Sequence, residues 1–175
     1  MGTTPAEGCD VSRLFIKQKV FSVGEKFTVF DELQQPRYFV RGSFMQIPKR
    51  FTVTTASDAP VAQITKTVFS FLPRFTVEME GVGLVATIRK QFSFFTPKYS
   101  VDGAALSVSG DWWDMNFSVF RANHEVARIH RKLLIWGDTY EVDIADDALE
   151  AMIVSLVVAI DRVRSDESSA NAATM

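Results

Sequence analysis

The sequence predicts a mainly β fold: a closed antiparallel barrel of about twelve short strands around a buried C-terminal helix. A short motif, an aromatic residue followed by any residue and then valine, recurs along most of the chain. Its copies begin at Phe27, Phe51, Phe75, Tyr99, Phe117 and Tyr140. Near the C-terminus this pattern stops, and an uninterrupted apolar run begins at Ala151. The repeats predict the strands, and the apolar run predicts the helix.

Each copy of the motif is the second half of a predicted hairpin. An alternating run precedes it, as IKQKV does from Ile16, and a short turn joins the two. In YEVDI, which begins at Tyr140, the aromatic and aliphatic residues fall on one face and the acidic residues on the other. Such alternation is typical of a half-buried strand. The remaining runs begin at Val40, Ile64, Ile88, Leu106 and Ile129, which gives six hairpins in all.

Antiparallel strands leave exposed edges unless the sheet closes, and a barrel of this many strands is too wide for its own side chains to fill. The sequence offers a plug, a helix predicted over residues 146–164. Its core AMIVSLVVAI, residues 151–160, is apolar apart from Ser155 and is shorter than the roughly 20 residues that cross a membrane. Acidic residues stand near its start, and Arg162 and Arg164 near its end, as the helix dipole favours. Its many β-branched residues leave a long buried strand as the alternative.

The domain organisation follows from these elements. Residues 1–13 form a polar leader, residues 14–164 a single domain, and residues 165–175 a small, polar tail that we expect to be disordered. Cys9 is the single cysteine, so no internal disulfide can form, which suits a reducing compartment. The N-terminus lacks the basic and apolar segments of a secretory signal. We therefore expect a cytoplasmic protein without a transmembrane span.

Several separated segments resemble one known family. IKQKVFSVGEKFTVFDE, GDWWDMNFSVF, and WGDTYEVDI followed by AIDRV are similar, in this order, to the LURP-one-related family. The resemblance extends from Leu14 to Arg164. It implies the tubby C-terminal-like fold, in which a barrel encloses a C-terminal helix. It also implies distant relatives that include the phosphoinositide-binding tubby proteins and the phospholipid scramblases, but it implies no catalytic site.

Composition and motifs argue against several classes of function. The formal net charge of −2 argues against a general nucleic-acid binder, which is normally basic. The sequence contains no nucleophile elbow, zinc-protease, P-loop or dinucleotide-binding motif, and two histidines, His124 and His130, are too few to predict a metal site. Acidic pairs such as Asp143 and Asp146 fit a strand exit and a helix cap better than a catalytic pair. We expect no enzymatic activity, cofactor or metal.

Four predicted strands carry a polar residue at a position whose neighbours point inward. These residues are Gln18, Lys66, Lys90 and Arg131. Burying a charge costs free energy unless the charge is paired. The simplest interpretation is a β-bulge, or side chains that reach out to the rim of the barrel. The alternative is a cationic ring that holds an anionic ligand, although the helix should already fill the interior.

An up-and-down strand order places the turns within hairpins at one end of the barrel and the turns between hairpins at the other. The first end collects Lys26, Lys49, Arg50, Arg74 and Lys98, against Glu25, Asp111, Asp114 and Asp138. The second end collects Asp31, Glu32, Asp58, Glu80, Asp102, Glu125, Asp146 and Asp147. Aromatic residues accompany the cations, among them Phe71, Phe94, Phe95, Trp112, Trp113 and Trp136. The near-neutral net charge would then conceal a polarised molecule.

From these patterns we expect a non-enzymatic binding or scaffold module. The leading hypothesis is peripheral association with anionic membrane lipid, because aromatic residues beside cations suit such a surface. Its candidate residues are Lys49, Arg50, Arg74 and Lys98, with Trp112 or Trp113 as anchors. The plainer interpretation is that the cations are solvated turns and that the aromatics seal the barrel mouth. The alternatives are a protein-interaction adaptor with a protein partner and, from the family resemblance, scramblase-like lipid handling; the sequence predicts no oligomeric state.

Overall fold

Twelve strands, a short 3-10 helix and one α-helix make up the described part of the chain. This part, in a computed structural model, comprises residues 11–19, 25–43, 45, 47–67, 74–91, 98–103, 105–134 and 137–172. The strands are β1 (Ser12–Lys19), β2 (Lys26–Phe30), β3 (Pro36–Gly42), β4 (Arg50–Thr55), β5 (Pro60–Thr67), β6 (Arg74–Met79), β7 (Gly83–Gln91), β8 (Lys98–Asp102), β9 (Leu106–Asp111), β10 (Asn116–Arg121), β11 (His124–Leu134) and β12 (Gly137–Ile144). The 3-10 helix η1 (Asp147–Leu149) and the helix α1 (Glu150–Ala172) follow. The fold is mainly β, as predicted.

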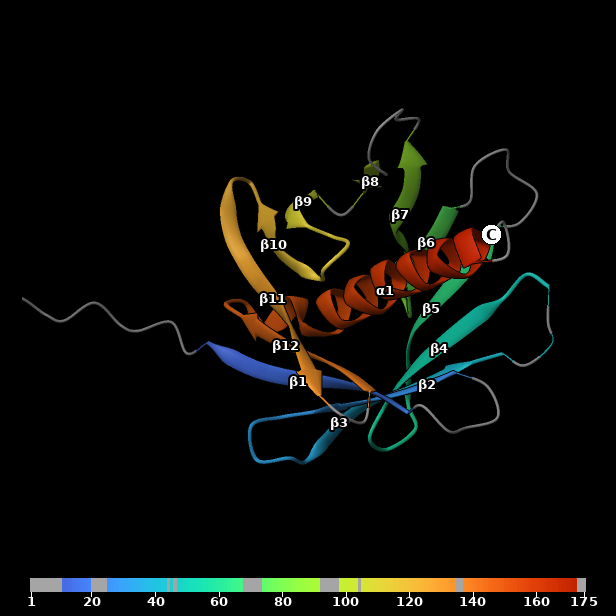
Figure 1. The fold of residues 1–175 in the computed structure, drawn as a ribbon. Coiled ribbons are helices and arrows are strands. Elements are labelled where there is room, and N and C mark those ends of the chain that lie inside the picture. Colours follow the sequence, from blue (N-terminus) through green and yellow to red (C-terminus); the bar gives the residue numbers. More distant parts are fainter. Residues whose placement is uncertain are drawn as a thin grey trace, which may run out of the picture.

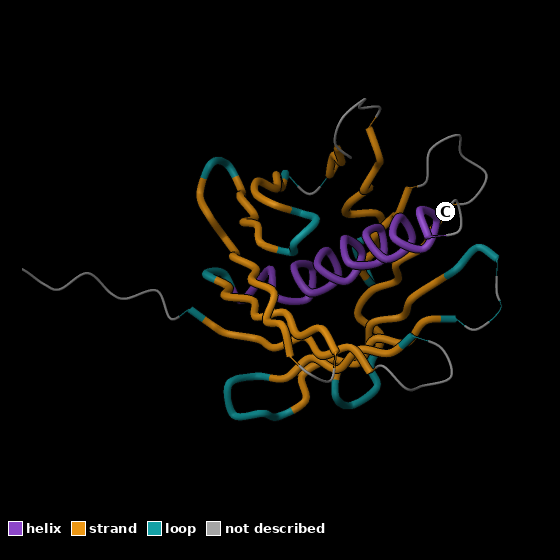
Figure 2. The backbone as a smooth tube through the Cα atoms, viewed as in Figure 1, coloured by secondary structure: helices purple, strands orange, loops and turns teal. Residues whose placement is uncertain are grey.

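All twelve strands belong to one antiparallel sheet that curls around α1 (Figures 1 and 2). Neighbours in the sheet are neighbours in sequence, except that β1 also pairs with β12, with Ser12 opposite Ile144. The sheet therefore ends at β8 and β9. Within the described residues no ladder joins these two strands, so the closure of the predicted barrel is not confirmed. β9 is suited to an edge, because Ser107, Ser109 and Gly110 expose small or polar groups there.

In the five copies whose side chains the structure describes, the recurring motif points its aromatic residue and its valine at the helix. Phe27, Phe51 and Phe75 are each 1% exposed, and the valine two residues later is buried in each of these strands. The residue between them alternates to the outer face. Register shifts follow Val29, Val53, Val77 and Val119, so these four copies also end in a bulge. The repeat thus encodes an inward-facing pair and then a bend in the strand.

The apolar run near the C-terminus is a helix, as predicted, and it lies along the inner face of the sheet (Figure 1). Every residue from Ile153 to Val163 is buried. Asp146 caps η1, which leads into α1, and its carboxylate accepts a hydrogen bond from the backbone N–H of Ala148 at 3.1 Å. The helix is longer than predicted. It continues past Arg164 to Ala172, and so includes most of the tail that we expected to be disordered.

The meander gathers the turns at two ends of the molecule. We call one the basic end, which comprises residues 43–50 and 111–116, and the other the acidic end, which comprises residues 31–36, 56–60 and 80–83. α1 begins at the acidic end, where Glu150 pairs with Arg37 at 3.0 Å. It ends at the basic end, where Asp166 pairs with Lys66 at 2.7 Å. The connections with Phe71, Phe94, Phe95 and Trp136 lie outside the described residues.

Candidate functional site at the basic end

The predicted cations lie at, or just before, the starts of alternate strands at the basic end, but their surroundings differ. Arg50 begins β4 with an exposed side chain, and its backbone N–H donates to the Ser43 hydroxyl at 3.0 Å. Lys49 forms an ion pair with Glu25 at 2.6 Å, so its charge is largely compensated. Arg74 begins β6 and is half-buried. The backbone of Lys98 begins β8, but its side chain lies outside the described residues.

The two predicted anchor tryptophans play different parts. Trp113 is 42% exposed, whereas Trp112 is half-buried and packs against the core. The Trp112 and Phe117 rings lie 6.2 Å apart between their centroids. The backbone N–H groups of Trp113 and Asp114 both donate to the Asp111 carboxylate at 3.0 Å, which fixes the turn. Trp113 is therefore presented to the surroundings, and Trp112 seals the interior beside it.

Sequence reasoning missed two residues at this end. Met45 and Ile47, in the turn between β3 and β4, are 86% and 79% exposed. They lie two to five residues before Lys49 and Arg50, so one hairpin tip combines exposed apolar side chains with nearby cations. The segment SFMQIPKR carries both apolar residues close to the cations, but we made no prediction for Met45 and Ile47.

Beneath the basic end lies a network of buried charges. Asp161, in α1, is 1% exposed, and it accepts hydrogen bonds from the Tyr140 hydroxyl and from Arg162, whose Nε lies 2.9 Å away. Arg162 also pairs with Glu25 at 2.8 Å, and Glu25 in turn pairs with Lys49. The charges therefore alternate along a chain that runs from the core to the surface.

Aromatic rings and opposite charges hold Arg162 in its charged form. Its guanidinium lies 5.0 Å from the Phe27 ring centroid and 6.0 Å from that of Phe51, two of the repeated aromatic residues. Burial alone would lower the pKa of Arg162, but the charges of Asp161 and Glu25 outweigh it, so the pKa is raised. The network is a permanent ion cluster, and its members are not free to bind another anion directly.

Of the inward polar residues of the strands, Lys66 faces the polar half of the helix. Lys66 pairs with Asp166, and Arg131 lies opposite Tyr140 in the β11–β12 register, at the level of the buried network. Gln18 is half-buried, and the Lys90 side chain lies outside the described residues. The bulge interpretation is wrong at these positions, because the register shifts occur elsewhere in the strands. The helix itself supplies the partner that Lys66 needs.

The described residues contain neither a cluster of metal ligands nor a helix suited to crossing a membrane. No group of three or more His, Cys, Asp or Glu side chains is placed to hold a metal ion. α1 is the longest helix in this part of the chain, and neither it nor any other combines the length and the apolar character needed to cross a bilayer. The chemistry that the basic end offers is attraction of anions to exposed cations, together with contact between apolar side chains and an apolar phase.

Comparisons with known proteins support the fold. A family model described as LURP-one-related matches residues 12–161, a span that contains all twelve strands and half of α1. The X-ray structure of a protein from Arabidopsis thaliana is similar, with a TM-score of 0.63 and 21% sequence identity over 86% of this chain and 91% of that one. No curated protein matches the chain in sequence. At this identity the structural likeness shows a shared fold and nothing about ligands.

Proposed function

Since the chain belongs to the LURP-one-related family, which fixes its fold but names no ligand, we propose from its own surface that it is a non-enzymatic module whose basic end attaches to anionic membrane lipid. The observation that carries this proposal is the β3–β4 hairpin tip. There Met45 and Ile47 are almost fully exposed, and Arg50 follows them without an ion pair to any described residue. Exposed apolar side chains beside unpaired cations suit a charged interface with an apolar interior.

The energetics favour weak and reversible attachment. A cation near an anionic surface contributes about 1 kcal/mol, and this attraction weakens as salt screens it. Insertion of apolar surface adds about 25 cal/mol for each Å² removed from water. Met45, Ile47 and Trp113 are the described apolar side chains available for such insertion. Because Lys49 is compensated by Glu25, Arg50 and Arg74 should carry most of the electrostatic part.

Flotation of the purified protein with neutral and with anionic vesicles, at low and at moderate salt, tests the proposal. We expect the protein to float with anionic vesicles at low salt, and the charge-reversal variant Arg50→Glu/Arg74→Glu to remain at the bottom of the gradient. Met45→Ser/Ile47→Ser should weaken flotation while leaving the charge unchanged. Matched controls at the opposite end are Arg121→Glu and Leu33→Ser, since both residues are exposed there. Flotation that is absent, or that is lost equally in the controls, would contradict the proposal.

Scramblase-like lipid handling is not proposed. It would require the apolar α1 to leave the sheet and enter the bilayer. α1 is held at its start by Arg37 and Tyr38, which both bind Glu150, and near its end by the ion pair of Lys66 with Asp166. Releasing it would expose these charges and the inner face of the sheet together.

A further inference from the structure

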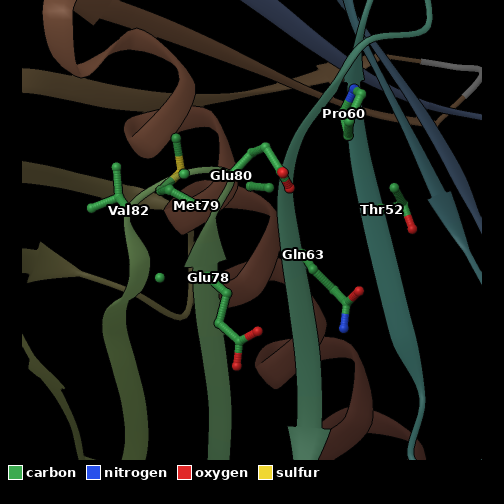
Figure 3. Close-up of a pocket in the computed structure, with 10 residues that line it drawn as sticks. Thr52, Pro60, Gln63, Glu78, Met79, Glu80 and Val82 are labelled. Carbon is green, nitrogen blue, oxygen red and sulfur yellow. The ribbon is translucent and has the colours of Figure 1, made fainter.

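A groove lies on the outer face of the sheet at the acidic end, away from the proposed lipid-binding surface. It has a volume of about 520 Å³ and is lined by parts of β4, β5 and β6 and by the β6–β7 turn. This volume is within the range of about 300–1,000 Å³ that is usual for ligand sites. Thr52, Gln63 and Glu78 lie opposite one another in the register of three adjacent strands and form one side of it (Figure 3).

The groove and its border are partly apolar. Met79 is half-buried against the core, Ala62 lies beneath, and Pro60 is exposed on the facing strand. Val82 lines the groove and is 75% exposed, and Leu84, two residues further on, is 62% exposed. The turn that carries Val82 is closed by a hydrogen bond from its backbone N–H to the Met79 carbonyl at 3.1 Å. Val82 and Leu84 lie outside the core, and a folded turn holds Val82 in place.

The charge of the groove is negative and uncompensated. Glu78 and Glu80 line it, both are exposed, and no Lys or Arg is among its lining residues. Figure 3 shows the Glu80 side chain extending from the turn toward β5. Neither carboxylate forms an ion pair with any residue that the structure describes. Most other carboxylates near this end are paired: Asp58 with Arg41, Asp102 with Arg89, Glu125 with Arg128 and Asp146 with Arg121.

We propose that this groove docks a peptide segment of a partner protein, one that carries a Lys or Arg next to an apolar side chain. The apolar residue would pack against Met79, Pro60 and Val82, and the cation would pair with Glu78 and Glu80. Charge complementarity selects this occupant, because the same two carboxylates would repel an anionic membrane or a nucleic acid. The proposal is independent of lipid binding, since the groove and the basic end share no residue.

Fluorescence anisotropy of the full chain with labelled synthetic peptides tests the docking site. The probe alternates Arg with Leu between Gly-Ser spacers, and two matched peptides replace Arg by Glu or Leu by Ser. We expect saturable binding of the Arg–Leu peptide alone, about tenfold weaker for Glu78→Gln/Glu80→Gln and for Val82→Ser. Glu32→Gln and Leu33→Ser, which change an exposed acidic and an exposed apolar residue outside the groove, should bind normally.

Several results would overturn the docking site. They are no saturable binding of the Arg–Leu peptide, equal binding of the Glu-containing peptide, or unchanged binding by the groove variants. Because all the substituted groove residues are exposed, the variants should fold normally, and circular dichroism spectra matching the parent would verify this. Loss of peptide binding with intact vesicle flotation would separate this site from the proposed lipid surface.

Discussion

Asp161 and Arg162 are adjacent residues in the most buried part of α1, a position where apolar side chains are the usual choice. Removing two charges from water costs several kcal/mol per ion, and a good ion pair often only balances that cost. Here the pair is extended by Tyr140 and Glu25, which supply the remaining hydrogen bonds. The cluster therefore contributes little net stability while it is complete. Removal of one member should lower the free energy of unfolding strongly, because it leaves the other charges buried without their partner.

The first prediction concerns this difference in stability between removing one charge of the cluster and replacing both. Asp161→Asn removes one charge with little change in shape, and we expect it to lower the free energy of unfolding by about 3–5 kcal/mol. The double variant Asp161→Leu/Arg162→Met replaces both charges with apolar groups and should cost much less than the sum of the single changes. Urea denaturation followed by circular dichroism measures both. A cost for Asp161→Asn below about 1 kcal/mol, the value typical of exposed pairs, would mean that the cluster is not buried as described.

The second prediction concerns alkaline pH. Burial, followed by the hydrogen bond to Glu150, raises the pKa of Tyr38 above its ordinary value of 10.0. A raised folded-state pKa contributes stability that is fully present below the unfolded value and is lost as the pH climbs toward the folded value. The parent should therefore lose more stability than Tyr38→Phe between pH 9 and 11.5, as measured by urea denaturation at each pH. Parallel pH profiles for the two proteins would contradict the burial of this hydroxyl.

At the scale of single residues, the sequence predicted which face of a strand a side chain takes better than it predicted the residue with which that side chain pairs. Alternation correctly placed Phe27, Phe51 and Phe75 inside, because a strand fixes which face each side chain takes. It also flagged Lys66 as an inward charge. It could not find Asp166, because that partner lies a hundred residues away on an element whose end was misjudged. Met45 and Ile47 were missed for a related reason, since a turn has no periodicity from which exposure can be predicted.

Among the elements, α1 has the sequence that says least about its position and its rotation inside the sheet. Residues 151–160 of α1 are apolar apart from Ser155, so a slide or a rotation of this part inside the sheet would change its contacts little. Polar contacts at both ends remove this freedom: Glu150 binds Arg37 and Tyr38, and Asp166 binds Lys66. The ion pairs thus specify the position of a helix whose burial supplies the stability, a role that buried polar groups also have in coiled coils.

The third prediction tests the last part of the helix. A chain ending at Arg164 loses the pair of Lys66 with Asp166 and the helix beyond it, and we expect a loss on the order of 1 kcal/mol in the free energy of unfolding. Lys66→Gln removes the same pair without shortening the chain and serves as the control. Hydrogen exchange of the intact protein should show protected amides through residue 172. Amides that exchange freely beyond Arg164 would contradict the extended helix.

The start of α1 could be predicted and its end could not. Asp146 before an apolar run is a strong signal for a helix start, and its carboxylate does cap η1, the 3-10 helix that leads into α1. SDESSANAA after Arg164 contains neither an apolar face nor a glycine or proline stop. Ser168 and Ser169 nevertheless continue the helix, with their hydroxyls donating to carbonyls one turn earlier. The contact of Asp166 with Lys66 in β5 favours the longer helix, and a contact so distant in sequence leaves no local pattern from which the end of α1 could be predicted.

For the whole molecule, the most consequential property is that its two ends differ in chemistry. The basic end presents bare apolar residues and cations, and the acidic end carries the negative groove beside the β6–β7 turn. If both proposed sites operate, the groove points away from a membrane that the basic end contacts. The protein would then join a lipid surface to a peptide, and the strand order alone would keep the two sites apart.

The sequence predicted this end-to-end difference from the meander, because consecutive antiparallel strands must alternate their turns. It did not predict how the sheet would finish. Closure depends on whether β8 and β9, the two short strands at the edges, align along their lengths, and alternation within each strand carries no such information. The pairing of β1 with β12 could be inferred only after a curled sheet had been assumed.

The position of the open edges has a practical consequence. β8 and β9 are consecutive in sequence, so the chain crosses the gap between the edges just after Gly103, whereas every other strand is hydrogen-bonded on both sides. A cut at this point would interrupt no ladder. It would leave one fragment with β1 to β8 and another with β9 to β12 and α1, joined by the β1–β12 ladder and a common core. Such a pair of fragments could serve as a split reporter, in which the two fragments reassemble into one folded domain when two proteins fused to them bind each other.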